Sequence, residues 1–314
     1  MIVLHLVCVA VGVAALVKSA DWFVDAAVSI ARRLHVPDLI VGVTLVSLAT
    51  TLPEFAVSLL AAFQSKAQIA VGNAMGSMIC NIGLILGLCT LLMPIRVVRR
   101  NFLRNGLWMV GLTGLFVGLG YYFPDGSRLV GAIMLTALVI YMGRLVWTSI
   151  REREAPGPSF SRPMPMPKAA GLFLLGTVGV IGGSQILIYG AEGLARSAGL
   201  PDLVIAVTLV ALGTSMPELS IALAAILKKQ RALSVGNVIG ANILNLAFVV
   251  GAASLVSPLP LERQTLLLDL PLIMVLTVLL LIFGLTGQRL ARREGAVLLT
   301  LYGAYIVLVF MVFR

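Results

Sequence analysis

Long apolar segments make up most of the chain, and short polar or basic gaps separate them. A membrane-spanning helix needs about 20 apolar residues, and ten segments of about that length follow one another along the sequence. They cover residues 2–30, 38–63, 68–92, 103–122, 128–150, 169–195, 202–227, 232–256, 266–286 and 295–313. The pattern predicts an all-α polytopic membrane protein with ten transmembrane helices.

The ten segments fall into two groups of five. Between the groups, residues 151–168 read REREAPGPSFSRPMPMPK, and this run of prolines and charges is unsuited to a helix interior. We therefore expect residues 1–150 and 169–314 to form two five-helix units, joined by an exposed linker at 151–168.

Composition supports a membrane protein, because 60% of the residues are hydrophobic, 11% are charged and the mean hydropathy is +1.06. In a soluble domain the net charge of +10 would suggest a nucleic-acid partner, but here the basic residues lie in the gaps between apolar segments. They therefore indicate topology rather than nucleic-acid binding.

The Lys and Arg residues of the gaps are distributed unevenly. When alternate gaps are taken as one side of the membrane, sixteen fall on one side and five on the other. The sixteen are Arg32, Arg33, Arg96, Arg99, Arg100, Arg104, Arg151, Arg153, Arg162, Lys168, Lys228, Lys229, Arg231, Arg289, Arg292 and Arg293, and the five are Lys66, Arg128, Arg196, Arg263 and Arg314. Because cytoplasmic loops carry the excess of basic residues, we expect a multi-pass protein of the plasma membrane, with both termini outside the cytoplasm and the linker inside it.

The sequence contains an internal repeat at an offset of 164 residues. Residues 42–87 align without a gap to residues 206–251, and 17 of the 46 positions are identical. Because five predicted helices separate equivalent positions, the second copy is expected to lie inverted in the membrane. Inverted repeats are typical of secondary transporters, whose substrate sites lie near the bilayer midplane between the repeats.

Each copy contains a proline followed by a glutamate inside an apolar segment, in TTLPE at 50–54 and TSMPE at 214–218. Pro53 and Pro217 have no N–H, so each opens the helical hydrogen-bond ladder and leaves carbonyl oxygens free. Hydroxyl and carboxylate groups three or four residues apart share one helix face with these carbonyls. The pattern predicts a broken helix in each copy with a cation site at the break.

The second conserved element of each copy is GNAMGSMICN at 72–81 or GNVIGANILN at 236–245. Its asparagines supply uncharged oxygen ligands, which suit a hard cation such as Ca²⁺. Their alternative role is hydrogen bonding between helices, and the Gly-xxx-Gly spacing favours close helix packing. We expect Asn81 and Asn245 at the site, and Asn73 and Asn237 nearer its edge.

Other roles for these residues were weighed. The prolines could only kink helices, and the glutamates could pair with buried cations, but the only Lys or Arg between Arg33 and Arg96 is Lys66, in a predicted loop. An acid at the centre of a spanning helix costs about 2.5–3.5 kcal/mol, which favours a functional role. For Asp21, Asp25, Glu192 and Asp269, nearer the predicted helix ends, pairing or snorkelling is the simpler interpretation.

Taken together, the two motifs resemble those of the cation/Ca²⁺ exchanger superfamily, whose paired repeats carry G-T-S-x-P-E followed by G-N-x-x-G-S-N-x-x-N. The chain is most similar to the prokaryotic Na⁺/Ca²⁺ exchanger branch. It departs from the pattern where Ala49 replaces a glycine, Thr51 a serine and Met78 an asparagine. Ala241 stands where a serine can bind Na⁺, and Asn245 where some relatives have aspartate.

The resemblance implies two inverted five-helix repeats with broken helices at the midplane and a cation site between them. It places four central residues, one from each broken helix, at Glu54, Asn81, Glu218 and Asn245. Flanking oxygens would come from the side chains of Thr50, Thr51, Ser77, Thr214 and Ser215 and from the carbonyls of Ser47 and Ala211.

The implied function is exchange of Ca²⁺ for Na⁺ by alternating access, with residues 2–30 and 169–195 as moving gates. H⁺/Ca²⁺ antiport is the alternative, because two carboxylates in a low-dielectric site can also bind protons. A cation channel on the same repeat is less favoured, since conduction needs several weak sites along an open path. No nucleophile motif or resident cofactor is expected, so the chain is not expected to be an enzyme.

Overall fold

The computed structural model describes residues 2–36, 38–151, 163–198 and 211–312. Within these ranges the molecule is helical apart from one pair of two-residue strands. Eight of the described helices are long and apolar enough to cross a membrane, and the bent pair at 39–63 makes nine. Residues 202–210, the first part of another expected span, lie outside the described residues, so the count of ten helices stays a prediction.

The first half of the chain runs from α1 to α8. Its elements are α1 (Ile2–Leu34), α2 (Asp38–Val41), the π-helix η1 (Gly42–Val46), α3 (Ser47–Thr50), α4 (Leu52–Phe63), α5 (Ala67–Ile79), the π-helix η2 (Cys80–Leu86), α6 (Gly87–Leu92), β1 (Ile95–Arg96), α7 (Arg99–Tyr122) and α8 (Arg128–Arg151).

The second half repeats this order. Its described elements are α9 (Met166–Ser197), α11 (Ala211–Thr214), α12 (Met216–Leu227), α13 (Arg231–Leu244), the π-helix η4 (Asn245–Val250), α14 (Gly251–Val256), the π-helix η5 (Thr265–Asp269), α15 (Leu270–Thr286), β2 (Arg289–Leu290) and α16 (Arg292–Val312). Helix α9 begins three residues before the expected end of the linker, because Pro167 is tolerated in the first turn, where its missing N–H is not needed.

Equivalent turns join α4 to α5 and α12 to α13. Ser65 and Lys229, which are 164 residues apart, both have positive φ, at 56° and 62°. In each turn an amide one residue later closes onto a helix carbonyl, from Lys66 to Ala61 at 2.8 Å and from Gln230 to Ala225 at 2.7 Å. This is the hydrogen-bond pattern that ends helices on a left-handed residue. The aligned copies therefore also share a local backbone geometry.

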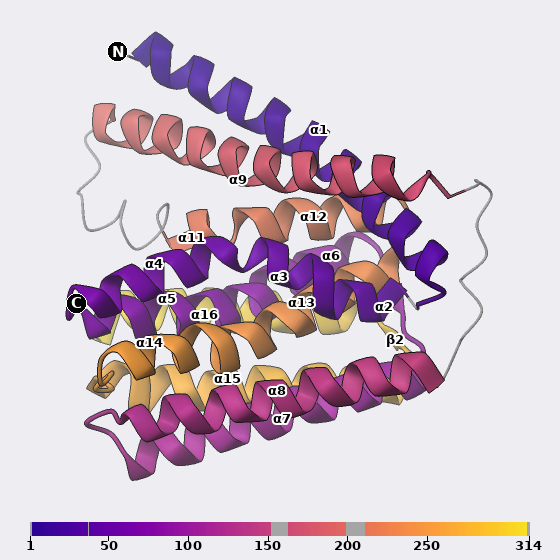
Figure 1. Cartoon of the computed structure of the whole chain (residues 1–314). Helices are drawn as coiled ribbons and strands as arrows, with labels where there is room; N and C mark the ends of the chain where they lie inside the picture. Colours follow the sequence, from indigo (N-terminus) through magenta and orange to yellow (C-terminus); the bar gives the residue numbers. More distant parts are fainter. Residues whose placement is uncertain (1, 37, 152–162, 199–210, 313–314) are drawn as a thin grey trace.

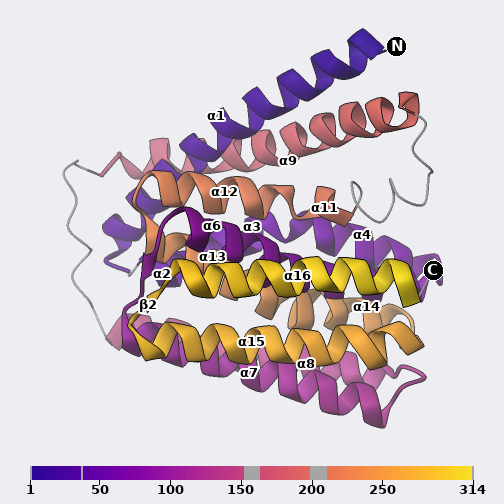
Figure 2. The same cartoon turned by 180° about the vertical axis from the view of Figure 1, so that it is seen from behind.

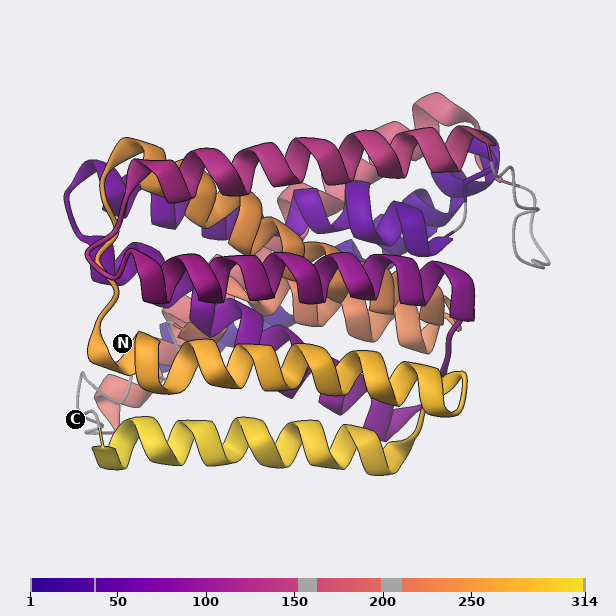
Figure 3. The ribbon, with the colours of Figure 1, turned by 90° about the horizontal axis from the view of Figure 1, so that it is seen from below.

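The helices are arranged in layers. Helices α1 and α9 lie side by side across one face of the molecule, and α7, α8, α15 and α16 form the opposite layer (Figures 1 and 2). Seen from below, the helices of that layer run as nearly parallel rows (Figure 3). The short helices that carry the repeat motifs lie between the two layers. The start of α1 and the end of α16 lie at the same end of the molecule, and the end of α8 lies at the other (Figure 1).

Helix α13 packs closely on the first repeat because it carries glycines where the chains meet. A Cβ at Gly240 would lie 2.4 Å from the Val43 carbonyl oxygen, and one at Gly236 would lie 2.3 Å from that of Leu39. This confirms the packing role expected for the second Gly-xxx-Gly pair. For Gly72 and Gly76 no atom of the described residues lies within 4 Å of an added Cβ, so their packing role stays a prediction.

The two halves also meet at a short strand pair. Strand β1 lies antiparallel to β2, with Ile95 opposite Leu290 and Arg96 opposite Arg289. Each strand comes from a loop after a long helix, one in each half, so the pair joins the two halves outside the helical layers. A continuous apolar pattern gives no signal for so short a pairing.

Candidate ion-binding site

The helix breaks predicted by the prolines are present. Residues 39–50 and 52–63 form two helical segments bent by 47° at Thr51, and Ser215 separates α11 from α12 in the same way. Pro53 and Pro217 lie in the first turns of α4 and α12, so Ala49 and Gly213 each lack the amide donor that a regular helix would supply four residues later.

One glutamate projects from the first turn after each break. Glu54 and Glu218 are both completely buried, and their carboxylates are close enough to interact electrostatically. The Thr50 hydroxyl lies beside Glu218. Glu54 comes from the first half and Glu218 from the second, so the structure brings together two acids that are 164 residues apart.

Most oxygens of this acidic pair are available to a ligand. Among the described residues, Glu54 Oε2 and both carboxylate oxygens of Glu218 have no hydrogen-bond partner. The remaining oxygen, Glu54 Oε1, accepts a bond from Ser77 Oγ at 3.5 Å, the outer limit for such a contact. Buried carboxylates without partners are costly, so this arrangement calls for a bound cation or proton.

The asparagines of the second motif surround the same centre. Asn81 and Asn245 are completely buried, and Asn81 Nδ2 donates to Asn242 Oδ1 at 3.1 Å. Asn81 Oδ1 and both amide atoms of Asn245 have no hydrogen-bond partner in the described part of the chain. Amide oxygens of this kind are ligands for hard cations.

These asparagines do not lie at helix breaks, which corrects one expectation. Helices α5 and α13 continue through π-helical segments that start at Cys80 and at Asn245, and the spans 67–92 and 231–256 remain continuous. A π-helical turn changes the register of the side chains without breaking the helix, and such turns are frequent at functional sites.

The flanking hydroxyls behave in two ways. Thr51 Oγ1 and Ser215 Oγ are buried without a hydrogen-bond partner among the described residues. Thr50 Oγ1 instead lies 3.2 Å from the Ser47 carbonyl and 3.3 Å from Asn237 Oδ1, contacts within reach of the one hydroxyl hydrogen.

The two expected carbonyl ligands are less open. The Ser47 carbonyl also accepts the Thr51 amide at 2.9 Å, so it is already engaged by two donors. Ala211 is the first residue of α11, and its side chain lies outside the described residues. Thr214 ends the same short helix and is half-buried.

Sequence analysis missed one residue at this site. Asn242 is completely buried and holds Asn81 across the interface between the two halves. The signal was present, because Asn242 occupies the position of the asparagine in G-S-N, which the second copy retains and the first replaces with Met78.

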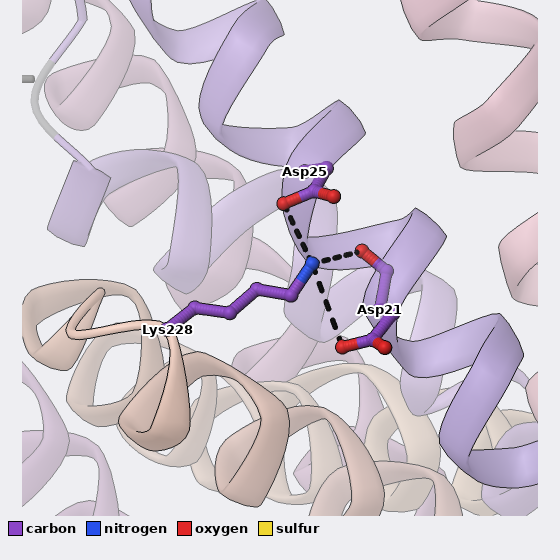
Figure 4. A network of polar contacts seen from close by, with 3 residues as sticks. All are labelled: Asp21, Asp25 and Lys228. Carbon is purple, nitrogen blue, oxygen red and sulfur yellow. Dashed lines mark hydrogen bonds and ion pairs between the residues drawn. The ribbon is translucent and has the colours of Figure 1, made fainter. Parts of the chain in front are cut away.

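Acids outside the site have other partners. Lys228 Nζ lies 2.7 Å from Asp25 Oδ1 and 3.4 Å from Asp21 Oδ1, and it donates to the Asp21 carbonyl at 2.9 Å (Figure 4). The pairing expected for these aspartates is confirmed, although the partner is about 200 residues away. Asp269 is buried, and its Oδ1 lies 3.5 Å from Gln264 Nε2.

The chemistry of the centre is that of a site for a hard cation. No group of three or more His, Cys, Asp or Glu residues suited to a metal occurs in the described ranges, so a soft or transition-metal cluster has no support there. Two carboxylates, amide oxygens and hydroxyls offer oxygen ligands with a formal charge of −2 when both acids are ionised.

Comparison with known proteins agrees with this geometry. A family model for sodium/calcium exchanger protein matches residues 4–147 and again residues 168–311. The chain is 34% identical to the inner membrane protein YrbG of Escherichia coli K12 over 96% of this chain and 95% of that protein. It is 29% identical to the sodium/calcium exchanger MaX1 of Methanosarcina acetivorans over 99% of this chain and 100% of that one.

Solved structures give the same result. The sodium-calcium exchanger NCX_Mj, soaked with 10 mM Na⁺ and 10 mM Sr²⁺, superposes with a TM-score of 0.85 at 31% identity, covering 98% of this chain and 99% of that one. Since the family model covers both halves of the sequence and the fold agrees over nearly its whole length, the chain belongs to the sodium/calcium exchanger protein family.

Proposed function

We propose that the protein is a secondary active antiporter that exchanges Ca²⁺ for Na⁺ across the membrane by alternating access. The observation that carries this proposal is the buried pair Glu54 and Glu218, whose oxygens lack protein partners among the described residues. Two carboxylates neutralise one Ca²⁺, and monovalent counter-ions can compete for the same oxygens. The names of MaX1 and NCX_Mj, both sodium/calcium exchangers, support the choice of ions.

The ligand set we propose is the one expected from the two repeats. Glu54, Asn81, Glu218 and Asn245 hold the ion, and Thr51 and Ser215 add hydroxyls that have no protein partner in the described ranges. Ser77 and Thr50 lie against the two carboxylates, and Thr214 with the carbonyls of Ser47 and Ala211 completes the shell.

The proposal includes ten transmembrane helices in two inverted repeats. It is supported by the family model, which matches two segments offset by 164 residues, and by the equivalent turns at Ser65 and Lys229. The packing supports it as well, since α1 lies against α9 and α7 against α15, which are equivalent helices of the two halves.

We assign the movement to α1 and α9. These two helices pack chiefly on each other and lie across the face of the molecule, so they can shift together while the layer of α7, α8, α15 and α16 stays in place (Figures 1 and 2). A shift of this pair would open the buried site to one side and then the other, as expected where repeats rock around a fixed midplane site.

The orientation follows from the basic residues. Arg96, Arg99 and Arg289 belong to the end of the molecule where α8 ends, and the start of α1 lies at the opposite end (Figure 1). With the basic end in the cytoplasm, both termini lie on the extracytoplasmic side of the plasma membrane.

H⁺/Ca²⁺ antiport is kept as a second candidate because of one observation. In the described structure the Glu54 and Glu218 carboxylates interact with each other and form no ion pair. When Ca²⁺ leaves, another cation must neutralise them, and a proton can do so as well as Na⁺.

Uptake of ⁴⁵Ca²⁺ into proteoliposomes tests both candidates. Vesicles loaded with Na⁺ are compared with vesicles that carry only a pH gradient, for wild type, Glu54→Gln and Glu262→Gln. Glu262 is exposed and lies outside the site, so its variant is a matched control for the loss of a carboxylate. We expect uptake to be driven by Na⁺, abolished in Glu54→Gln and retained in Glu262→Gln.

Other results would change the function. Uptake driven only by the pH gradient would establish H⁺/Ca²⁺ antiport, and uptake unaffected by Glu54→Gln would remove the proposed site. An imposed membrane potential adds the stoichiometry: exchange of three Na⁺ for one Ca²⁺ moves one net charge, about 2.3 kcal/mol per 100 mV, whereas exchange of two monovalent ions is electroneutral.

A further inference from the structure

A groove on the layer opposite α1 and α9 combines arginines with an apolar surface. It lies between α7 and α8 and has a volume of about 370 Å³. Arg104 and Arg144 line it together with Trp108, Gly111, Leu115 and Ala137. The exchange site lies elsewhere in the fold, and none of its residues lines this groove.

The arginines gather at one end of the groove. Arg104 is five residues after the start of α7, and Arg144 is seven residues before the end of α8. With a rise of about 1.5 Å per residue, both lie about 8–10 Å in from those helix ends. Because α7 and α8 are joined by a short loop and run antiparallel, these depths belong to the same membrane face, the one with Arg99 and Arg100.

A buried hydrogen-bond network fixes this end of the groove. Tyr141 donates to Asn105 Oδ1 at 3.0 Å, and Asn105 Nδ2 donates to the Asn101 carbonyl at 2.9 Å. Asn101 Oδ1 in turn accepts Arg104 Nη2 at 3.1 Å. Tyr141 and Asn105 are buried, so the network joins α8 to α7 and positions the Arg104 guanidinium.

The charges in this region are all of one sign on the two helices. Neither α7 nor α8 contains Asp or Glu, and none occurs in the described neighbours α13, η4, α14 and α15. A guanidinium pair that leads into an apolar, membrane-facing groove complements a molecule with an anionic head and a hydrocarbon tail. Trp108, between the arginines and the apolar part, is of the type found at membrane interfaces.

We propose that the α7–α8 groove binds an anionic phospholipid of the leaflet at the arginine-rich end, with its phosphate on Arg104 and Arg144 and an acyl chain along Gly111, Leu115 and Ala137. Guanidinium groups bind phosphate oxygens through paired charge-assisted hydrogen bonds. Basic pockets between transmembrane helices on the cytoplasmic side are a known type of lipid site. The proposal does not depend on which ions are exchanged.

Thermal unfolding of the full-length protein in a neutral detergent tests the proposal. Phosphatidylglycerol is titrated in, with phosphatidylcholine and inorganic phosphate as separate titrants. We expect a saturable rise in Tm with phosphatidylglycerol alone, and about a tenfold loss of apparent affinity for each arginine removed in Arg104→Gln and Arg144→Gln. A double variant with Arg99→Gln and Arg128→Gln removes the same charge from the same helices and should keep the wild-type response.

Three results would overturn the proposal. An equal rise with phosphatidylcholine would show that the headgroup charge is not recognised, and an equal rise with inorganic phosphate would show an anion site without lipid. A wild-type response in the Arg104→Gln and Arg144→Gln variants would place the lipid elsewhere. If Arg104→Gln does not fold, Arg144→Gln alone decides, because Arg144 is exposed.

A second readout locates the acyl chain. The chain has three tryptophans, and replacing Trp22 and Trp147 with Phe leaves Trp108 as the only fluorophore of this kind. At the same mole fraction, phosphatidylglycerol with brominated acyl chains should quench Trp108 more strongly than brominated phosphatidylcholine. The excess should disappear in Arg144→Gln; equal quenching by the two lipids would contradict the proposed site.

Discussion

Replacing Gly240 with alanine should separate the two repeats at the ion site. An added Cβ would lie 2.4 Å from the Val43 carbonyl oxygen, 2.7 Å from Val43 Cα and 2.4 Å from Ser47 Oγ. Two of these three atoms belong to the backbone of a completely buried residue, so rotation of a side chain cannot relieve the contact.

The size of the displacement follows from these distances. Ordinary contact begins at 3.4 Å, so the 2.4 Å approach must open by 1.0 Å. The same movement would carry the 3.3 Å contact between Thr50 Oγ1 and Asn237 Oδ1 to about 4.3 Å, beyond hydrogen-bond range. Overpacking of this kind costs about 1–3 kcal/mol, and we expect the upper part of that range together with a loss of Ca²⁺ uptake.

The assay is the free energy of unfolding in mixed detergent micelles, with ⁴⁵Ca²⁺ uptake as the functional measurement. Gly303→Ala is the control, because Gly303 is exposed on α16 and no described atom lies within 4 Å of an added Cβ. In a helix this control should be neutral or stabilising by about 0.5–1 kcal/mol.

Two outcomes would refute the reasoning. If Gly240→Ala is as stable as Gly303→Ala, the close approach between α13 and η1 does not limit packing. If adding Ser47→Ala restores the stability of Gly240→Ala, the limiting contact is the Ser47 hydroxyl and not the Val43 backbone.

Two further changes test contacts between the halves. Asn242→Ala removes the acceptor that holds Asn81, and with about 0.6–1.7 kcal/mol for a hydrogen bond between membrane helices we expect the KM for Ca²⁺ uptake to rise about threefold to twentyfold; an unchanged KM would mean that this bond does not position the ligand. The ion pair of Lys228 with Asp25 should contribute little despite its 2.7 Å distance, because the Asp25 side chain is 53% exposed. A double-mutant cycle with Lys228→Ala and Asp25→Ala should give a coupling of about 0.2–1 kcal/mol, and a coupling above about 2 kcal/mol would contradict this.

The parts of the site encoded by local sequence could be predicted. Proline lacks an N–H wherever it stands, so the breaks before Pro53 and Pro217 follow from the sequence itself. The repeat then relates Glu54 to Glu218, and their burial together follows from the inverted arrangement expected of such repeats. The apolar segments likewise gave most helix ends within a few residues.

The parts that depend on packing could not. The π-helical turns at Cys80 and Asn245 change the helix register without any residue that a sequence pattern marks. Asn81 bonds to Asn242 and Asp25 pairs with Lys228 only because distant helices meet. The strand pair at Ile95 and Leu290 has no alternating pattern to reveal it.

The pairing of helices between the halves also determines how the protein is made. Helix α1 lies against α9, α7 against α15, α8 against α14 and α6 against α16, so the first half completes its contacts only with helices that are translated later. While the ribosome is still making α9–α16, Glu54 lies in the membrane without Glu218. Folding of the core must therefore wait until most of the chain has been inserted. A truncated first half should be recognised by membrane quality control and degraded, and the two halves expressed as separate chains should rescue each other.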